Sequence, residues 1–88
     1  MVAVEDLGRL KASVRAAVKA ALETHLRTEP QRTSRSRIKR LRGLSRPQYR
    51  LRIGDIRAFY DVEAGVVQVL AIVPKSETAS WLAQFGKA

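Results

Sequence analysis

The chain has 88 residues, enough for one domain with a single hydrophobic core. It has no cysteine and one histidine, which excludes disulfides, thiolate metal sites and a metal site built from several histidines. Its formal net charge of +9 indicates an acidic or polyanionic partner.

Residues 3–27 have the spacing of an amphipathic helix. Apolar positions recur every three or four residues and mark one face: Leu7, Leu10, Val14, Ala17, Val18, Ala21 and His25. Gly8 and Ser13 weaken the first half, and Ser13 can cap a second helix that begins at Val14. The pattern therefore fits two short antiparallel helices or one kinked helix. Acidic residues interrupt the basic face, which favours packing on a core over binding to a membrane surface. His25 falls near the helix end, where a cation complements the helix dipole, and catalysis is its alternative role.

Pro30 ends this helix, and the polar residues 31–37 predict an exposed connection. Three apolar residues then follow at a spacing of three, and we expect about one turn that they anchor: Ile38, Leu41 and Leu44. The basic side chains between them then point outward: Lys39, Arg40 and Arg42. Residues 45–47 predict a loop, because Pro47 lacks a backbone donor and restricts the residue before it.

Residues 49–61 predict a β-hairpin with one apolar face and one basic face. Successive side chains of a strand point to opposite faces, so Arg50 and Arg52 lie opposite the apolar residues that alternate with them. Gly54 and Asp55 supply the turn, and a second strand begins at Ile56. The hairpin therefore presents three cations on a rigid sheet, as a site for a polyanion would: Arg50, Arg52 and Arg57.

Residues 63–65 predict a second turn and residues 66–73 a third strand, which makes an antiparallel meander. Its largely apolar strands require helices on at least one face. Pro74 ends the third strand, and Ser76 can cap a short final helix. The inner face of that helix is predicted to hold Leu82, Ala83 and Ala79. Trp81 and Phe85 lie on a neighbouring stripe, as packing groups rather than base-stacking groups. We therefore expect an α+β fold in a single domain, residues 1–88.

The excess positive charge is concentrated in one third of the chain. Residues 27–57 contain eleven basic and two acidic residues, a net charge of +9, and the rest of the chain is balanced. Arginine dominates there, and its planar guanidinium suits bidentate contacts to phosphate. RNA or DNA is the favoured target, through neutralisation of phosphates, and a surface matched to an acidic protein is the alternative.

The chain resembles the RelE/ParE superfamily of bacterial toxins, the toxin halves of type II toxin–antitoxin pairs. The matching segments are Ile38-Lys-Arg-Leu-Arg-Gly43, Tyr49-Arg-Leu-Arg-Ile-Gly-Asp-Ile-Arg57, Phe59-Tyr60-Asp61 and Val67–Val73 followed by Lys75. The resemblance implies a compact RelE-like fold, in which a helical hairpin packs on an antiparallel sheet. The family usually opens with a β-strand before the first helix. In this chain that strand is absent or reduced to about residues 2–4, which leaves a sheet edge less protected.

The resemblance also implies an activity. The RelE branch cleaves mRNA in the ribosomal A site without a metal or cofactor, by attack of the ribose 2′-hydroxyl on the adjacent phosphate. By motif position, four residues match groups that hold and activate the phosphate: Arg50, Arg52, Arg57 and Lys75. Six further residues are expected to bind RNA: Arg35, Arg37, Lys39, Arg40, Arg42 and Arg46. Arginine is an effective donor to a charged phosphate, which makes the assignment coherent.

Two departures from the active branch favour other interpretations. Family nucleases often have lysine where this chain has Arg52, and an arginine hardly deprotonates, so it is a poor general base. The branch also has an arginine and a base-stacking tyrosine after the last strand, where this chain has Lys75 and, later, Trp81. The alternatives are a ParE-like toxin that poisons DNA gyrase, and a catalytically weakened member that binds RNA or only its antitoxin. All of them imply a small acidic antitoxin as partner.

The sequence predicts a soluble cytoplasmic protein. The longest nearly apolar run, residues 66–73, is too short to cross a bilayer and contains Gln68. The N-terminus carries Glu5 and Asp6 and lacks the continuous apolar segment of a signal peptide.

Overall fold

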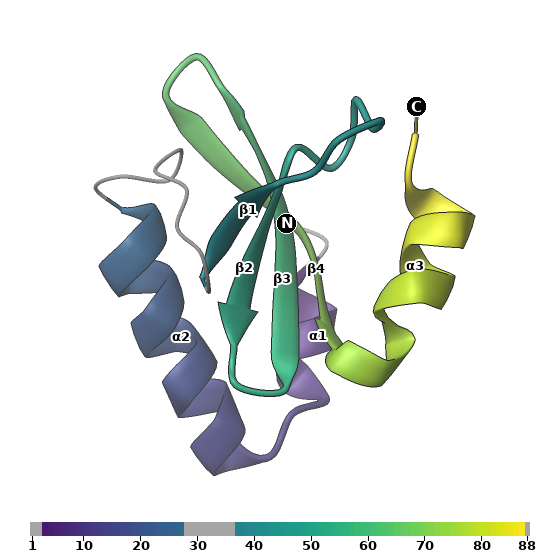
Figure 1. Cartoon of the computed structure of the whole chain (residues 1–88). Helices are drawn as coiled ribbons and strands as arrows, with labels where there is room; N and C mark the ends of the chain where they lie inside the picture. The colour runs from purple at the N-terminus through teal and green to yellow at the C-terminus, as the bar shows by residue number, and fades with distance from the viewer. Residues whose placement is uncertain (1–2, 28–36, 88) are drawn as a thin grey trace.

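The computed structural model describes residues 3–27 and 37–87, whose strands form one antiparallel sheet in sequence order (Figure 1). The strands are β1 (Ile38–Arg40), β2 (Tyr49–Ile53), β3 (Ile56–Glu63) and β4 (Val66–Pro74). The helical elements are α1 (Ala3–Gly8), α2 (Ala12–Leu26), the short 3-10 helix η1 (Lys75–Glu77) and α3 (Thr78–Phe85). The predicted α+β meander with N-terminal helices and a C-terminal helix is confirmed. Most of the predicted connection, residues 31–36, lies outside the described residues.

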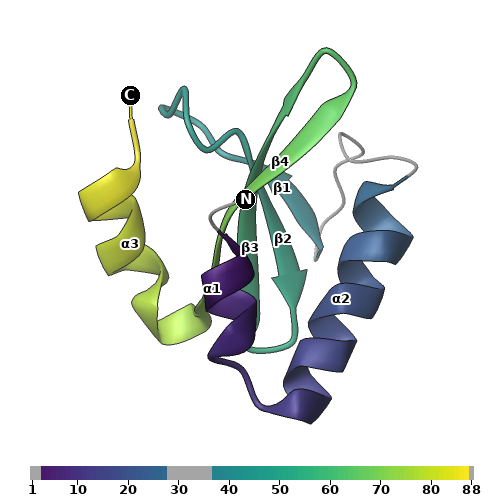
Figure 2. The same cartoon turned by 180° about the vertical axis from the view of Figure 1, so that it is seen from behind.

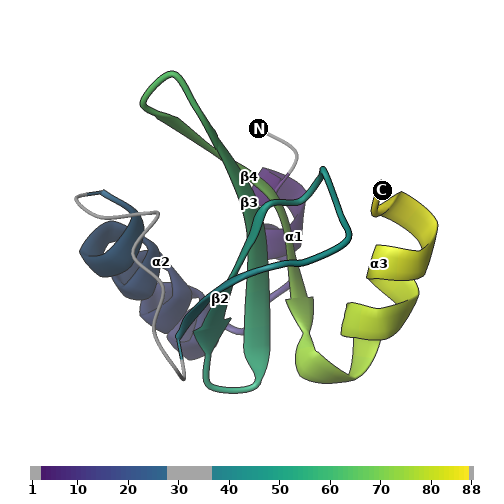
Figure 3. The same cartoon turned by 45° about the horizontal axis from the view of Figure 1, so that its top comes forward.

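The sheet lies between α2 on one side and α3 on the other (Figures 1 and 3). The face toward α2 carries the main core. Every second residue of β2 and β3 points to this face, and these residues are apolar. The buried members of this core are Val18, Leu26, Ile38, Tyr49, Leu51, Ala58, Tyr60, Val69 and Ile72. The α2 face therefore provides most of the hydrophobic stabilisation, and the opposite face is left for other side chains.

The N-terminal segment forms two helices, which confirms the first of the two predicted alternatives. The chain turns between α1 and α2, and Arg15 donates from Nε to the Leu7 carbonyl and from Nη2 to the Leu10 carbonyl, at 3.2 and 3.0 Å. These bonds satisfy carbonyls at and just beyond the end of α1 that have no partner within a helix. Lys11 is the N-cap of α2, so the prediction that Ser13 caps it is wrong.

The short helix α1 lies along the outer edge of β4, at the sheet edge that the sequence leaves unprotected (Figure 2). Asp6 Oδ2 accepts a hydrogen bond from the Ile72 backbone N–H at 2.9 Å. Ala3 and the residues that follow it are helical, so residues 3 and 4 form no first strand. A helix and a carboxylate thus satisfy an edge donor that would otherwise face solvent.

The predicted turn at residues 38–44 is wrong, because Ile38–Arg40 forms the strand β1. Ile38 pairs with Leu51 and is buried in the core, and Lys39 pairs with Arg50. The spacing of three apolar residues suggested a turn, but pairing with the edge of β2 satisfies more backbone groups.

The C-terminal helix packs on the sheet through Trp81. Its indole stacks on the fully buried Phe59, with ring centroids 4.9 Å apart and an interplanar angle of 5°. Phe85 contacts the indole at 5.6 Å in a tilted arrangement. Ala79 and Ala83 are exposed, so the predicted inner face of this helix is wrong for these two residues, and the indole takes their place.

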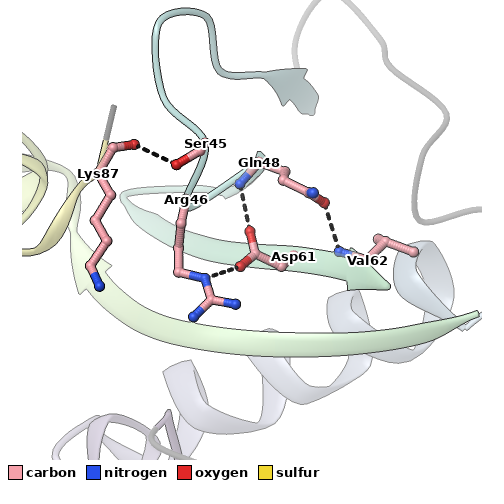
Figure 4. Close-up of polar contacts among 6 residues, drawn as sticks. All are labelled: Ser45, Arg46, Gln48, Asp61, Val62 and Lys87. Carbon is pink, nitrogen blue, oxygen red and sulfur yellow. Dashed lines mark hydrogen bonds and ion pairs between the residues drawn. The ribbon is translucent and has the colours of Figure 1, made fainter. Parts of the chain in front are cut away.

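A polar junction joins residues 45–48, β3 and the C-terminus (Figure 4). Asp61, which is 4% exposed, accepts from Arg46 Nε at 2.8 Å and from the Gln48 backbone N–H at 2.7 Å. The Gln48 side-chain oxygen accepts from the Val62 N–H at 2.9 Å. The Lys87 carbonyl accepts from the Ser45 N–H at 2.7 Å. One buried carboxylate therefore holds the segment that leads into β2.

The substitution Asp61→Asn tests this junction. Asparagine keeps the size of the side chain but removes the charge and replaces one acceptor oxygen with a donor. We expect the free energy of unfolding, measured by urea denaturation, to fall by about 1–3 kcal/mol. Glu63→Gln, an exposed charge change on the same strand, should stay within about 0.5 kcal/mol of the wild type. Equal losses in the two variants would contradict the assignment.

Candidate functional site

Strand pairing gathers basic side chains on the sheet face opposite the main core. Residues paired across a ladder share a face, and Arg52 pairs with Arg57 while Lys39 pairs with Arg50. Arg50 and Arg52 are two residues apart on β2 and so point the same way. We call these four residues the basic row: Lys39, Arg50, Arg52 and Arg57. The predicted grouping of the three hairpin arginines on one face is thus what the structure shows.

Arg50 lies at the centre of the basic row and is partly buried. Its Nε is inaccessible to solvent and has no hydrogen-bond partner among the described residues. Desolvation lowers the pKa of Arg50, and the charges of Arg57 and Arg52 lower it further. A cation so placed gains from an anion that restores the lost solvation and offsets the repulsion.

Arg57 is not the exposed cation that the sequence suggested, since only 7% of it is accessible. Its Nη1 donates to the Gly54 carbonyl at 2.7 Å and to the Ile56 carbonyl at 3.0 Å. Gly54 has a positive φ of 56°, so the turn exposes backbone groups that this guanidinium satisfies. Arg57 therefore holds the β2–β3 turn while adding positive charge to the basic row.

Arg52 and Lys75 lie at the same end of the sheet as the β2–β3 turn, and both are exposed. The Lys75 backbone N–H donates to the Asp55 carbonyl of that turn at 2.7 Å. Arg50, Arg52 and Arg57 thus share one face of the sheet, and the backbone of Lys75 lies at the end of the sheet where Arg52 and Arg57 pair. No ion pair between described residues involves any of the four.

The residues expected to bind RNA are divided among several surfaces. Lys39 belongs to the basic row, and Arg42 is exposed in the segment between β1 and β2. Arg40 donates to the Tyr49 hydroxyl at 3.1 Å and lies over its ring, so it packs against a core residue. Arg46 is paired with Asp61. Arg37 is exposed before β1, and Arg35 lies outside the described residues.

Two features limit the chemistry that the basic row can perform. The described part of the row contains no side chain that accepts a proton at neutral pH, because arginine and lysine are charged there. One face of the Trp81 ring is occupied by Phe59, and the ring also contacts Phe85, which leaves it a packing group. The row can therefore bind and stabilise anionic oxygens, but it does not supply a general base.

The described residues contain no group of three or more His, Cys, Asp or Glu side chains placed to hold a metal ion. None of the helices in residues 3–27 and 37–87 is long and apolar enough to cross a membrane.

Sequence reasoning missed Asp61, whose carboxylate fixes the segment before β2. A signal was present, because the acidic residue directly follows three apolar residues, Ala58, Phe59 and Tyr60, within a predicted strand. An acid in such a position requires donors nearby. Its partner Arg46 lies 15 residues away in sequence, and only the fold brings the two together.

An apolar groove lies between α1, β4 and α3, beside the junction. The cavity is about 430 Å³ in volume and includes Leu70, Val73, Trp81 and Phe85 among its lining residues. Phe85 is 53% exposed, which is unusual for a large aromatic side chain.

Comparison with known proteins gives two matches. A family model described as the ParE toxin of type II toxin–antitoxin system, parDE, matches residues 2–79. A solved structure, the RelB–RelE antitoxin–toxin complex from Methanococcus jannaschii, is similar at 18% sequence identity with a TM-score of 0.69. The similarity covers 90% of this chain and 91% of that one, and at this identity it concerns the fold. No curated protein matches the chain.

Removing the Arg57 side chain should cost stability, because this buried residue donates to the Gly54 and Ile56 carbonyls. We expect Arg57→Ala to lower the free energy of unfolding by about 1.5–3 kcal/mol in urea denaturation. Arg52→Ala, which removes an exposed arginine from the directly opposed position, should change it by about 0.5 kcal/mol or less. An Arg57→Ala protein as stable as Arg52→Ala would show that Arg57 has no role in the turn.

Proposed function

The chain belongs to the family of ParE toxins of type II toxin–antitoxin systems, and from its basic row we propose that it inhibits translation. In this proposal residues 1–88 act as one toxin domain that cleaves mRNA on the ribosome, in the cytoplasm and without a metal. A cognate antitoxin protein neutralises it.

The single observation that carries this proposal is the state of Arg50. A partly buried guanidinium that forms no ion pair with a described residue and lies beside Arg52 and Arg57 gains from the charge of a phosphate group. The cations are held by a paired sheet, so they need little rearrangement when a charge develops on the ligand.

In the proposed reaction the ribose 2′-oxygen forms a bond to the adjacent phosphorus, and the 5′-oxygen of the next nucleotide leaves and takes up a proton. The products are a 2′,3′-cyclic phosphate and a 5′-hydroxyl. Arg50 and Arg52 stabilise the additional charge on the phosphate oxygens, and Lys75 lies at the same end of the sheet. The proton of the 2′-hydroxyl leaves to a group outside the basic row.

A second candidate function is poisoning of DNA gyrase without cleavage of nucleic acid. Two observations favour it: the Arg57 guanidinium is bound to backbone carbonyls, and the described basic row has no proton acceptor. Under this interpretation the row is a binding surface only.

Both candidates require an acidic antitoxin. The net charge of +9 attracts such a partner over a long range, and the groove beside Phe85 offers apolar area for one of its segments. An antitoxin that covers the basic row and fills this groove would remove the row from its target.

Induction of the chain in cells separates the two functions. We expect arrested translation and mRNA ends at ribosome-stalled codons, without a DNA-damage response. Arg50→Gln and Arg52→Gln should each lower the cleavage rate by about 10²–10³-fold, the typical cost of removing one preorganised donor. Lys19→Gln removes one charge from the exposed side of α2 and should leave the rate unchanged.

A DNA-damage response with intact mRNA would establish the gyrase interpretation and exclude the nuclease. Full cleavage activity in Arg50→Gln would show that the basic row is not the site, even if the protein is a nuclease.

A further inference from the structure

A cleft separate from the centre of the basic row opens between α2 and the end of the β2–β3 hairpin. Its volume is about 360 Å³, and its lining includes Ala21, Arg37, Arg52, Ile53 and Gly54. The described residues that line it include two arginines and no acidic residue. Both arginines are exposed to solvent.

The backbone fixes the two arginines relative to each other. The Arg52 N–H donates to the Arg37 carbonyl at 2.8 Å, which continues the β1–β2 ladder by one residue. The two side chains therefore leave the backbone at neighbouring positions, Arg37 just before β1 and Arg52 in β2, and both line the cleft.

His25 of α2 contacts the same site. Its Nε2 lies 3.0 Å from Nη1 of Arg37, and it follows Ala21 by one helical turn. A guanidinium can only donate, so in this contact the imidazole accepts through Nε2. His25 thus contributes an acceptor that any ligand oxygen must compete with.

We propose that this cleft binds a backbone phosphate of single-stranded RNA through Arg37 and Arg52, next to the phosphate at Arg50. The choice of RNA as ligand rests on the proposed function. The bound phosphate oxygens accept from Arg37 Nη1 in place of His25 Nε2, and the imidazole changes its environment as a result.

Continuity of charge favours a nucleic acid over a protein carboxylate. Arg52 belongs both to the cleft and to the basic row, so a chain with regularly spaced phosphates occupies both sites at once. Each phosphate contact then adds to the salt dependence of binding, as in other single-strand binders.

The single histidine of the chain makes the site observable. Its imidazole gives one set of ¹H–¹⁵N cross-peaks in NMR spectra. These cross-peaks can be assigned to His25 without a variant, because the chain has no other histidine. Titration of the full chain with a 2′-O-methyl uridine tetranucleotide, which cannot be cleaved, should shift the His25 cross-peaks in a saturable manner. Cross-peaks that do not move while the oligonucleotide binds would overturn the proposal.

Matched variants identify the groups responsible. Arg37→Gln and Arg52→Gln should each reduce the slope of log Kobs against log salt by about 0.7, the value for one lost phosphate contact on a single strand. Lys19→Gln removes the same charge about 200° around α2 from Ala21 and should leave the slope unchanged. Equal effects of Lys19→Gln and Arg52→Gln would mean non-specific attraction and would overturn the proposal.

A polyglutamate peptide serves as the competing ligand. If the peptide shifts the His25 cross-peaks and the oligonucleotide does not, the cleft is a protein-binding site and the proposal fails. These binding measurements do not depend on whether the protein is toxic in cells. If mRNA is cleaved in cells and Arg37→Gln binds the oligonucleotide as the wild type does, the nuclease function stands and the cleft site is rejected. If the oligonucleotide binds at the cleft but translation is not arrested, the cleft site stands and the nuclease function is rejected.

Discussion

Backbone pairing in the β2–β3 ladder places Arg52 directly opposite Arg57, with Arg50 two residues away on the same face. Like charges in directly opposed positions repel and destabilise a sheet. The fold tolerates this cost because the opposite face of the same strands carries the main hydrophobic core. Arg50 and Arg52 are therefore held beside Arg57 by interactions in which their own charges take no part.

The basic residues of this region differ in whether their charge is paired within the protein. The Arg57 guanidinium is bound to turn carbonyls, Arg46 is paired with Asp61, and Arg40 packs on Tyr49. Those interactions build the frame of the hairpin and of the segment before it. Arg50 and Arg52 form no ion pair with described residues, and they remain the groups with the most to gain from an external anion.

The hairpin and its basic face could be predicted from the sequence, because alternation over residues 49–53 and the turn at Gly54 are local signals. The strand Ile38–Arg40 could not, since it depends on pairing with β2 across eight residues of intervening chain and its apolar spacing also fits a turn. The burial of Arg57 likewise depends on turn carbonyls whose direction the residue types do not specify. The junction of Arg46 with Asp61 and the contact of Arg37 with His25 join residues 15 and 12 apart, and only the fold brings them together.

The most direct test of the account is the stability of the protein with and without an anion. Thermal unfolding of the wild type and of Arg50→Met should be compared in chloride buffer and in pyrophosphate at equal ionic strength. If Arg50 is a desolvated cation that binds phosphate, Arg50→Met is more stable than the wild type in chloride, and pyrophosphate raises its stability little. The wild type should gain about 2.7 kcal/mol when the anion is present at 100 times its Kd. An Arg50→Met protein that is less stable in chloride and gains as much from pyrophosphate as the wild type would contradict the account.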